Sequence, residues 1–233
     1  IDSPRSGEQK ARISSENQGM TWWADYKIVM EESQGCSMDL SAWVSIINQS
    51  GASYRNARLK LIAGDVHRAE PSQPRREVMY SAAMAEDAGA GFTEKAFFEY
   101  HLYTLDRPTT VKNNEQKQVT LLEASDFGIK KRLIFYGAAY YFRGSYGQVE
   151  SNQKVGVFLD FENSESNGLG MPLPKGTVRV YKRDHNGAQQ FIGEDLIDHT
   201  PRDETLRIRM GEAFDVVADR RQMDYTVISS CVS

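Results

Sequence analysis

The chain has 233 residues, of which 28 are Lys or Arg and 32 are Asp or Glu, so its formal net charge is -4. A chain of this length can bury a substantial core without support from disulfides or metals. The charge balance, with no basic tail or stripe, argues against nucleic acid as a partner, and no apolar run approaches the ~18 residues that a membrane span needs.

The first third of the chain alternates apolar and polar residues with a period of two, which is typical of half-buried strands. The alternation covers residues 20–31 and 38–48, and a turn-rich gap at 33–35 separates them. We therefore predict a β-hairpin, followed by a third strand over 57–66 that continues an antiparallel meander.

The alternation fails between residues 67 and 93, where prolines stand at one end and glycines at the other. A segment this long without a regular pattern is unusual inside a compact domain. We expect a mobile excursion over 67–93, with a short strand around residues 77–80.

Strand periodicity returns after this excursion and continues through the rest of the chain. Asn186 and Gly187 form a strong hairpin signal between two of the later strands. The expected strands cover 97–105, 118–123, 128–136, 155–162, 177–182, 189–193 and 205–210.

About a dozen short strands and no long amphipathic helix predict an all-β fold with antiparallel β-sandwich architecture and little helix. One large sandwich and two packed β subdomains are both compatible with this pattern. We place a division near Arg107 and Pro108, which gives an N-terminal part, 1–107, and a C-terminal part, 108–233.

The two ends of the sequence and its two cysteines each permit one prediction. The chain begins at Ile1 and ends within an expected strand, so we interpret it as a fragment of a larger protein. Cys36 and Cys231 are the only cysteines. Two free thiols are the favoured state, and one long-range disulfide is the alternative for an exported protein.

Asp160 and Glu162 are the only candidates for acid–base catalysis that the pattern indicates. They lie two residues apart in an expected strand, so their side chains share a face and are about 6–7 Å apart along it. Paired carboxylates can support glycoside hydrolysis. The competing interpretation is that they form the solvated side of an amphipathic strand.

No metal or cofactor site is expected. The four histidines, His67, His101, His185 and His199, are dispersed, and their spacing matches no known zinc pattern.

Aromatic residues gather between positions 135 and 146, among several glycines. Tyrosine offers a flat apolar face and a polar hydroxyl, so Tyr140, Tyr141 and Tyr146 are candidates for a platform that binds sugar rings. Packing in the core of a sandwich uses the same residues and is the alternative.

The order of several segments resembles the DUF4139 domain family of mucoidy-inhibitor-type bacterial proteins. The sequence Gly-Met-Thr-Trp-Trp-Ala-Asp-Tyr opens the match at 19–26, and further matching segments lie at 40–44, 48–51, 57–66, 99–103, 176–181 and 191–194. The resemblance implies a β-rich bacterial domain of the periplasm or cell envelope, with no assigned activity and with further strands on both sides.

We therefore hypothesise a non-catalytic binding or scaffolding module of an exported or envelope-associated bacterial protein, with a protein or a glycan as its partner. The alternative is a carbohydrate-active hydrolase that uses Asp160 and Glu162 beside an aromatic wall. A third hypothesis is self-association, because a long meander leaves edge strands that can pair with another chain.

Overall fold

The computed structural model describes residues 13–30, 37–64, 83–87, 92–97 and 100–227. Fourteen strands account for most of these residues, and helix within them is confined to two 3-10 turns, η1 (Ala139–Phe142) and η2 (Glu165–Asn167). The predicted all-β fold with little helix is confirmed.

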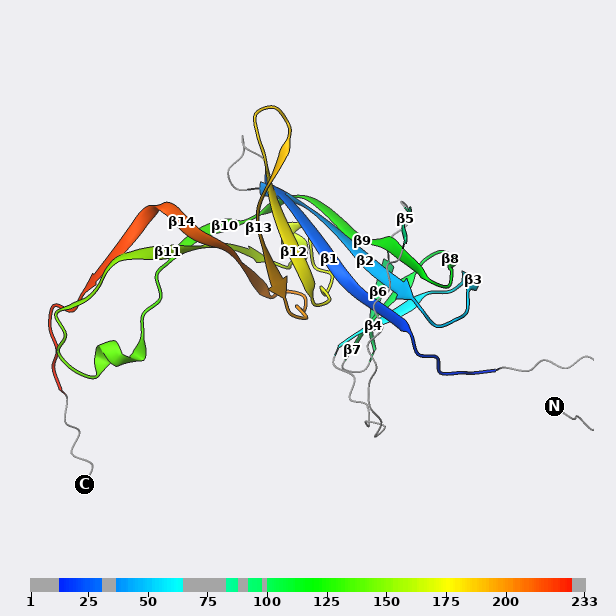
Figure 1. The fold of residues 1–233 in the computed structure, drawn as a ribbon, viewed down its shortest axis with the longest axis horizontal. Helices are drawn as coiled ribbons and strands as arrows, with labels where there is room; N and C mark the ends of the chain where they lie inside the picture. The colour runs from blue at the N-terminus through cyan, green and yellow to red at the C-terminus, as the bar shows by residue number, and fades with distance from the viewer. Residues whose placement is uncertain (1–12, 31–36, 65–82, 88–91, 98–99, 228–233) are drawn as a thin grey trace, which may run out of the picture.

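The largest sheet has six strands in the order β13-β12-β1-β2-β9-β5 (Figure 1). Their bounds are β1 (Met20–Met30), β2 (Ser37–Asn48), β5 (Ala83–Asp87), β9 (Glu115–Gly128), β12 (Gly176–Arg183) and β13 (Gln189–Ile197). The antiparallel pairs β1–β2 and β12–β13 confirm both predicted hairpins. Two pairings, β1–β12 and β5–β9, are parallel, so the sheet is mixed.

Three smaller sheets complete the fold. One has the order β4-β7-β6, and another has the order β10-β11-β14, while β3 pairs with β8 alone. Their bounds are β3 (Tyr54–Ala57), β4 (Lys60–Ala63), β6 (Phe92–Phe97), β7 (Tyr100–Leu105), β8 (Thr109–Val111), β10 (Lys130–Ile134), β11 (Gln148–Glu162) and β14 (Thr205–Arg221). Figure 1 shows β11 and β14 extending together away from the six-stranded sheet as a long ribbon.

The third strand does not continue the meander, which corrects the sequence prediction. The neighbour of β2 is β9, whereas β4 pairs with β7 in a different sheet. The buried side chain of Asn48, at the end of β2, contacts the turns at this end of the sheet. Its Nδ2 donates to the carbonyls of Ala52 (2.8 Å) and Lys112 (2.9 Å), and so holds the following turn against the turn after β8.

The excursion predicted over 67–93 contains β5 and the start of β6, so part of it is regular strand. The strand expected at 77–80 lies outside the described residues. The proposed division at Arg107 and Pro108 runs through the six-stranded sheet, because β1 and β2 precede it while β9, β12 and β13 follow it.

The core lies between the inner face of the six-stranded sheet and the two three-stranded sheets. Alternation along β1 buries Ala24, Tyr26 and Ile28. Residues from β4 and β7, such as Leu61 and Tyr103, belong to the same core cluster, as do residues from β11 and β14. The two smaller sheets therefore cover one face of the large one, which is sandwich packing.

One extended segment, residues 171–174, meets all of these sheets and is called the junction segment below. Its sequence is Met-Pro-Leu-Pro, so two of its four residues have no backbone N–H. The carbonyl of Pro172 accepts from the Tyr103 hydroxyl on β7 (2.8 Å), and that of Pro174 accepts from the Tyr26 hydroxyl on β1 (2.7 Å).

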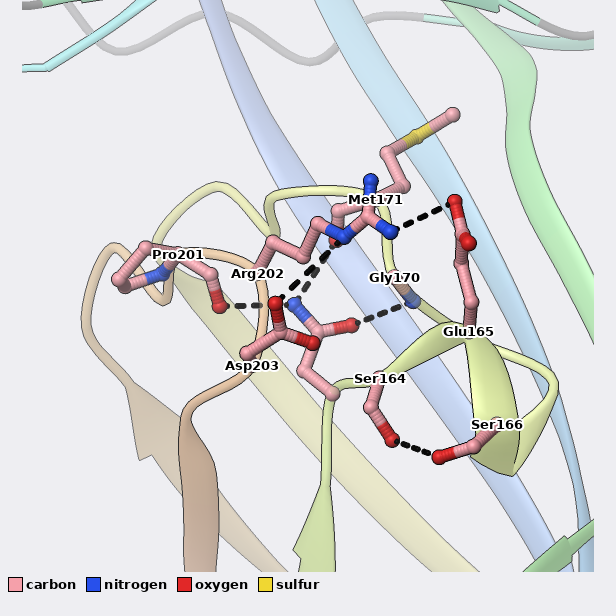
Figure 2. Close-up of polar contacts among 9 residues, drawn as sticks. Ser164, Glu165, Ser166, Gly170, Met171, Pro201, Arg202 and Asp203 are labelled. Atoms are coloured by element: carbon pink, nitrogen blue, oxygen red, sulfur yellow. Dashed lines mark hydrogen bonds and ion pairs between the residues drawn. The ribbon is translucent and has the colours of Figure 1, made fainter.

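The other two carbonyls of the junction segment are bound from β11 and from the connection between β13 and β14. Leu173 exchanges two backbone hydrogen bonds with Thr200 (2.8 and 2.9 Å). Asn163, fully buried and directly after β11, donates from Nδ2 to the carbonyls of Met171 (2.9 Å) and Pro201 (3.0 Å), and Figure 2 labels both acceptor residues. All four carbonyls of the segment are thus satisfied by different parts of the fold.

Two glycines allow the chain to enter and leave the junction segment. Gly170 has a φ of +99°, and a Cβ there would lie 2.9 Å from the backbone nitrogen of Glu165. Its N–H donates to Asn163 Oδ1 (3.1 Å). At Gly176, where β12 begins beside β1, a Cβ would lie 2.1 Å from the carbonyl oxygen of Ala24, so only glycine allows this parallel approach.

The substitutions Tyr26→Phe and Tyr103→Phe should each lower the free energy of unfolding by about 1–3 kcal/mol, because each leaves a buried proline carbonyl without its donor. Urea denaturation measures the loss. Tyr181→Phe is the matched control, since Tyr181 lies on the outer face of β12, away from the junction segment. If Tyr26→Phe and Tyr103→Phe were as stable as Tyr181→Phe, the hydrogen bonds to the junction segment would not stabilise the fold.

Candidate binding surface

Asp160 is held by two arginines from the strands on either side of it. It lies in β11, between β10 and β14, and its side chain is 7% exposed. Arg207 binds the carboxylate through two nitrogens, Nε to Oδ1 and Nη2 to Oδ2, both at 2.8 Å. Arg132 adds a third bond, from Nε to Oδ2 at 2.9 Å. The carboxylate is therefore fixed in place by charge-assisted hydrogen bonds.

This environment is unsuited to acid catalysis. The hydrogen bonds from Arg207 outweigh burial and hold the pKa of Asp160 below its ordinary value. A general acid needs a raised pKa, so that it carries a proton to donate near neutral pH. Asp160 is instead an ionised carboxylate whose two oxygens are both occupied. Glu162 is exposed. It lines a cleft of about 450 Å³ together with Asp160, Lys130 and Arg132.

Strand pairing gathers four basic side chains on the face that carries Asp160. Lys130 and Arg207 lie directly opposite Asp160 on the two neighbouring strands, and Arg132 and Arg209 lie opposite Phe158 in the same way. Partners in an antiparallel pair share a face. We call these four residues, Lys130, Arg132, Arg207 and Arg209, the cationic face.

The cationic face was not predicted from the sequence. The available signal was the i, i+2 spacing of two basic residues in each of two predicted strands. That spacing places each pair on one face of its own strand, but it does not say that both strands flank β11.

The three candidate tyrosines come together in the loop between β10 and β11, at the far end of the ribbon (Figure 1). The ring of Tyr140 meets those of Tyr141 (4.5 Å, 74°) and Tyr146 (5.7 Å, 87°) edge to face. Tyr141 is buried, whereas Tyr140 and Tyr146 are 44% and 46% exposed. The Tyr140 ring is steeply inclined to both of the others, so the three do not form a single flat platform.

Arg220 organises this aromatic cluster from β14. Its guanidinium lies 4.7 Å from the ring centroid of Phe135 and 5.0 Å from that of Tyr141. A hydrogen bond to Glu150, together with burial, raises the pKa of Tyr141 to about 12. A cleft of about 720 Å³ opens beside these residues, lined also by Phe142 and Tyr225. Asp160 and Glu162 line a separate cleft, so the carboxylates and the aromatic cluster are not combined.

No histidine of the described residues joins a group that could hold a metal ion. His101 contacts Glu94 through Nδ1 at 2.8 Å, and His199 accepts from the backbone nitrogen of Lys175 at 3.2 Å. His185 is exposed in the turn between β12 and β13. His67 and the two cysteines, Cys36 and Cys231, lie outside the described residues.

The described part of the chain contains no helix with the length and apolarity required to cross a membrane. Comparisons with protein-family models, curated proteins and solved structures find no match for this chain. The resemblance to the DUF4139 family therefore stays a prediction.

Asp160→Asn should destabilise the fold by about 1–3 kcal/mol at about pH 7, because the amide cannot accept the same charged bonds from two arginines. The pKa of Asp160 is lowered in the folded state, so its contribution is present above the unfolded-state pKa of about 3.9. That contribution is lost as the pH falls through the folded-state value.

Urea unfolding of the wild type and the variant as a function of pH measures this contribution. The difference in the free energy of unfolding should disappear at acidic pH. Asp215→Asn, on an exposed position of β14, is the control and should change stability little at any pH. A destabilisation by Asp160→Asn that persists unchanged at the lowest pH would contradict the electrostatic explanation.

Proposed function

We propose that this chain is a non-catalytic binding or scaffolding module of an exported or envelope-associated bacterial protein. The observation that carries the binding role is the aromatic end of the ribbon, where large apolar side chains are exposed around the cleft beside Arg220. Phe142, which lines this cleft, is 81% exposed, and Met223, between Gln222 and Asp224 of its lining, is 85% exposed. Exposed apolar groups gathered on one surface often mark interaction sites.

The aromatic end is organised before any partner binds. Arg220 is placed between two rings, and Gln222 donates from Nε2 to the carbonyls of Tyr141 and Gly144, both at 3.0 Å. Gln222 also accepts from the backbone nitrogen of Tyr146 at 2.7 Å. These contacts tie the loop to β14, which reduces the conformational entropy that binding would cost.

A glycan is a partner that this surface can accommodate. Exposed faces of Tyr140 and Phe142 can stack on sugar rings, while the polar residues that line the cleft, including Arg221 and Asp224, can bind hydroxyl groups. The hydrolase alternative has no comparable support, because Asp160 is neutralised by two arginines in another cleft.

The module should bind glycans through the aromatic end without cleaving them. In a glycan-array measurement, the Tyr140→Ala, Phe142→Ala double variant should lose the binding that the wild type shows, because both stacking faces are removed. Phe191→Ala removes an exposed ring of similar size from β13 and should have no effect. Release of sugar products by the wild type, or full binding by the double variant, would contradict the proposal.

A further inference from the structure

β10 is an exposed edge strand. It pairs with β11 on one side, and no described strand pairs with its other side. Residues 130–133 are all exposed, and Ile134 is half-buried. The outer edge of β10 therefore presents backbone N–H and C=O groups that another strand can bind.

The charge at this edge is strongly positive. β10 begins with Lys130, Lys131 and Arg132, and Arg207 and Arg209 of the cationic face lie on β14, on the far side of β11 from this edge. Asp160 is the one carboxylate in the strand rows of the cationic face, while Glu162 lies two residues further along β11, where it pairs with Thr205.

Several of these cationic groups remain available to a partner. Lys130 and the guanidinium of Arg209 have no ion pair within the described residues, while the backbone nitrogen of Arg209 donates to Asp195 at 2.7 Å. Arg132 uses only Nε to bind Asp160, so its two terminal nitrogens can still donate.

A second copy of β10 is a poor occupant of this edge. Pairing of two such strands would bring lysine and arginine side chains close to their own counterparts, and like charges across a strand pair are destabilising. Lysines on an edge strand protect sheets against such pairing. The self-association considered from the sequence is therefore disfavoured at this particular edge.

Nucleic acid also fits poorly. Phe158, the aromatic ring at the centre of the cationic face, is 7% exposed and is covered by Arg207 (6.0 Å) and Tyr136 (5.9 Å), so it cannot stack on a base. The formal charge of the whole chain, -4, opposes the dense charge of a duplex.

We propose that the outer edge of β10 binds an extended acidic peptide as an additional strand. Aspartates or glutamates at every second position of the peptide would lie opposite Lys130 and Arg132, because side chains on one face of a strand recur with a period of two. Apolar residues between them would contact Leu133, which is 49% exposed on the other face. Main-chain bonds supply affinity in this mode of recognition, and the side chains supply specificity.

This interaction is separate from the aromatic end of the ribbon, so either proposal can fail without the other. The test uses a fluorescent peptide of alternating Glu and Val, about eight residues long, which matches a typical strand. Fluorescence anisotropy at low salt should show saturable binding to the wild type, and binding should weaken as salt is added. The same peptide with Lys in place of Glu should not bind.

Charge reversal on β10 identifies the site. Lys130→Glu should weaken peptide binding at least about tenfold, because it replaces attraction by repulsion at the edge. Lys60→Glu is the matched control, since Lys60 is an exposed lysine on β4, the edge strand of another sheet. Binding by this control should stay within about twofold of the wild type.

Methylation of alternate backbone nitrogens in the peptide separates strand addition from simple charge attraction. The methylated peptide keeps every side chain but cannot form the ladder, so its binding should be lost. The proposal would be overturned by equal binding of the methylated peptide, by the absence of wild-type binding, by equal effects of the two lysine variants, or by tighter binding of duplex DNA in competition.

Discussion

The hydrogen bonds to the junction segment, residues 171–174, fix the arrangement of the sheets. A buried carbonyl without a donor is costly, so each of the four carbonyls must find one. The donors come from Tyr26 on β1, Tyr103 on β7, Asn163 after β11 and Thr200 before β14. Each lies in a different part of the fold, so one short segment determines how the parts meet.

The ribbon formed by β11 and β14 is buried at the end near the junction segment and exposed at the other end. Near the junction segment, Leu159, Leu206 and Ile208 are buried in the common core. Beyond Gly211, β14 has no buried residue, and its partner residues 148–154 in β11 are exposed or half-buried. The inner half thus belongs to the core, and the outer half carries the aromatic cluster away from it, as Figure 1 shows.

The two halves of the ribbon have different roles: the inner half contributes to stability, and the outer half carries the surface that we propose for binding. The arginines that neutralise Asp160 lie at the inner half, where their pairing holds three strands in register. The exposed aromatic rings lie at the outer half, where their removal should cost little stability. A binding surface displayed on a ribbon can reach a partner without disturbing the core that supports it.

The sequence was sufficient to predict the strands, because alternation with a period of two is a local property. The alternation predicted β1, β2, β12 and β13, and Asn186 with Gly187 indicated the hairpin between β12 and β13. The alternation was not enough to predict which strands pair, because β9 lies beside β2 although several strands separate them in the sequence.

Prediction of the candidate sites was limited in the same way, because the sequence does not show which strands pair. Asp160 could be placed on a strand face, but its two arginine partners come from strands on opposite sides of β11. Asn163 carried no signal, because a single asparagine after a strand usually indicates only a turn. Its three side-chain contacts, with Gly170, Met171 and Pro201, form only in the folded chain.

Because the junction segment is shared by the sheets, they should unfold as one unit. Native-state hydrogen exchange at increasing urea measures this for each amide. Amides of β1, of β7 and of the inner half of β11 should converge on one opening free energy, because loss of the shared segment exposes all three. If β7 or β11 opens at a distinctly lower free energy while β1 stays protected, the junction segment does not couple the sheets.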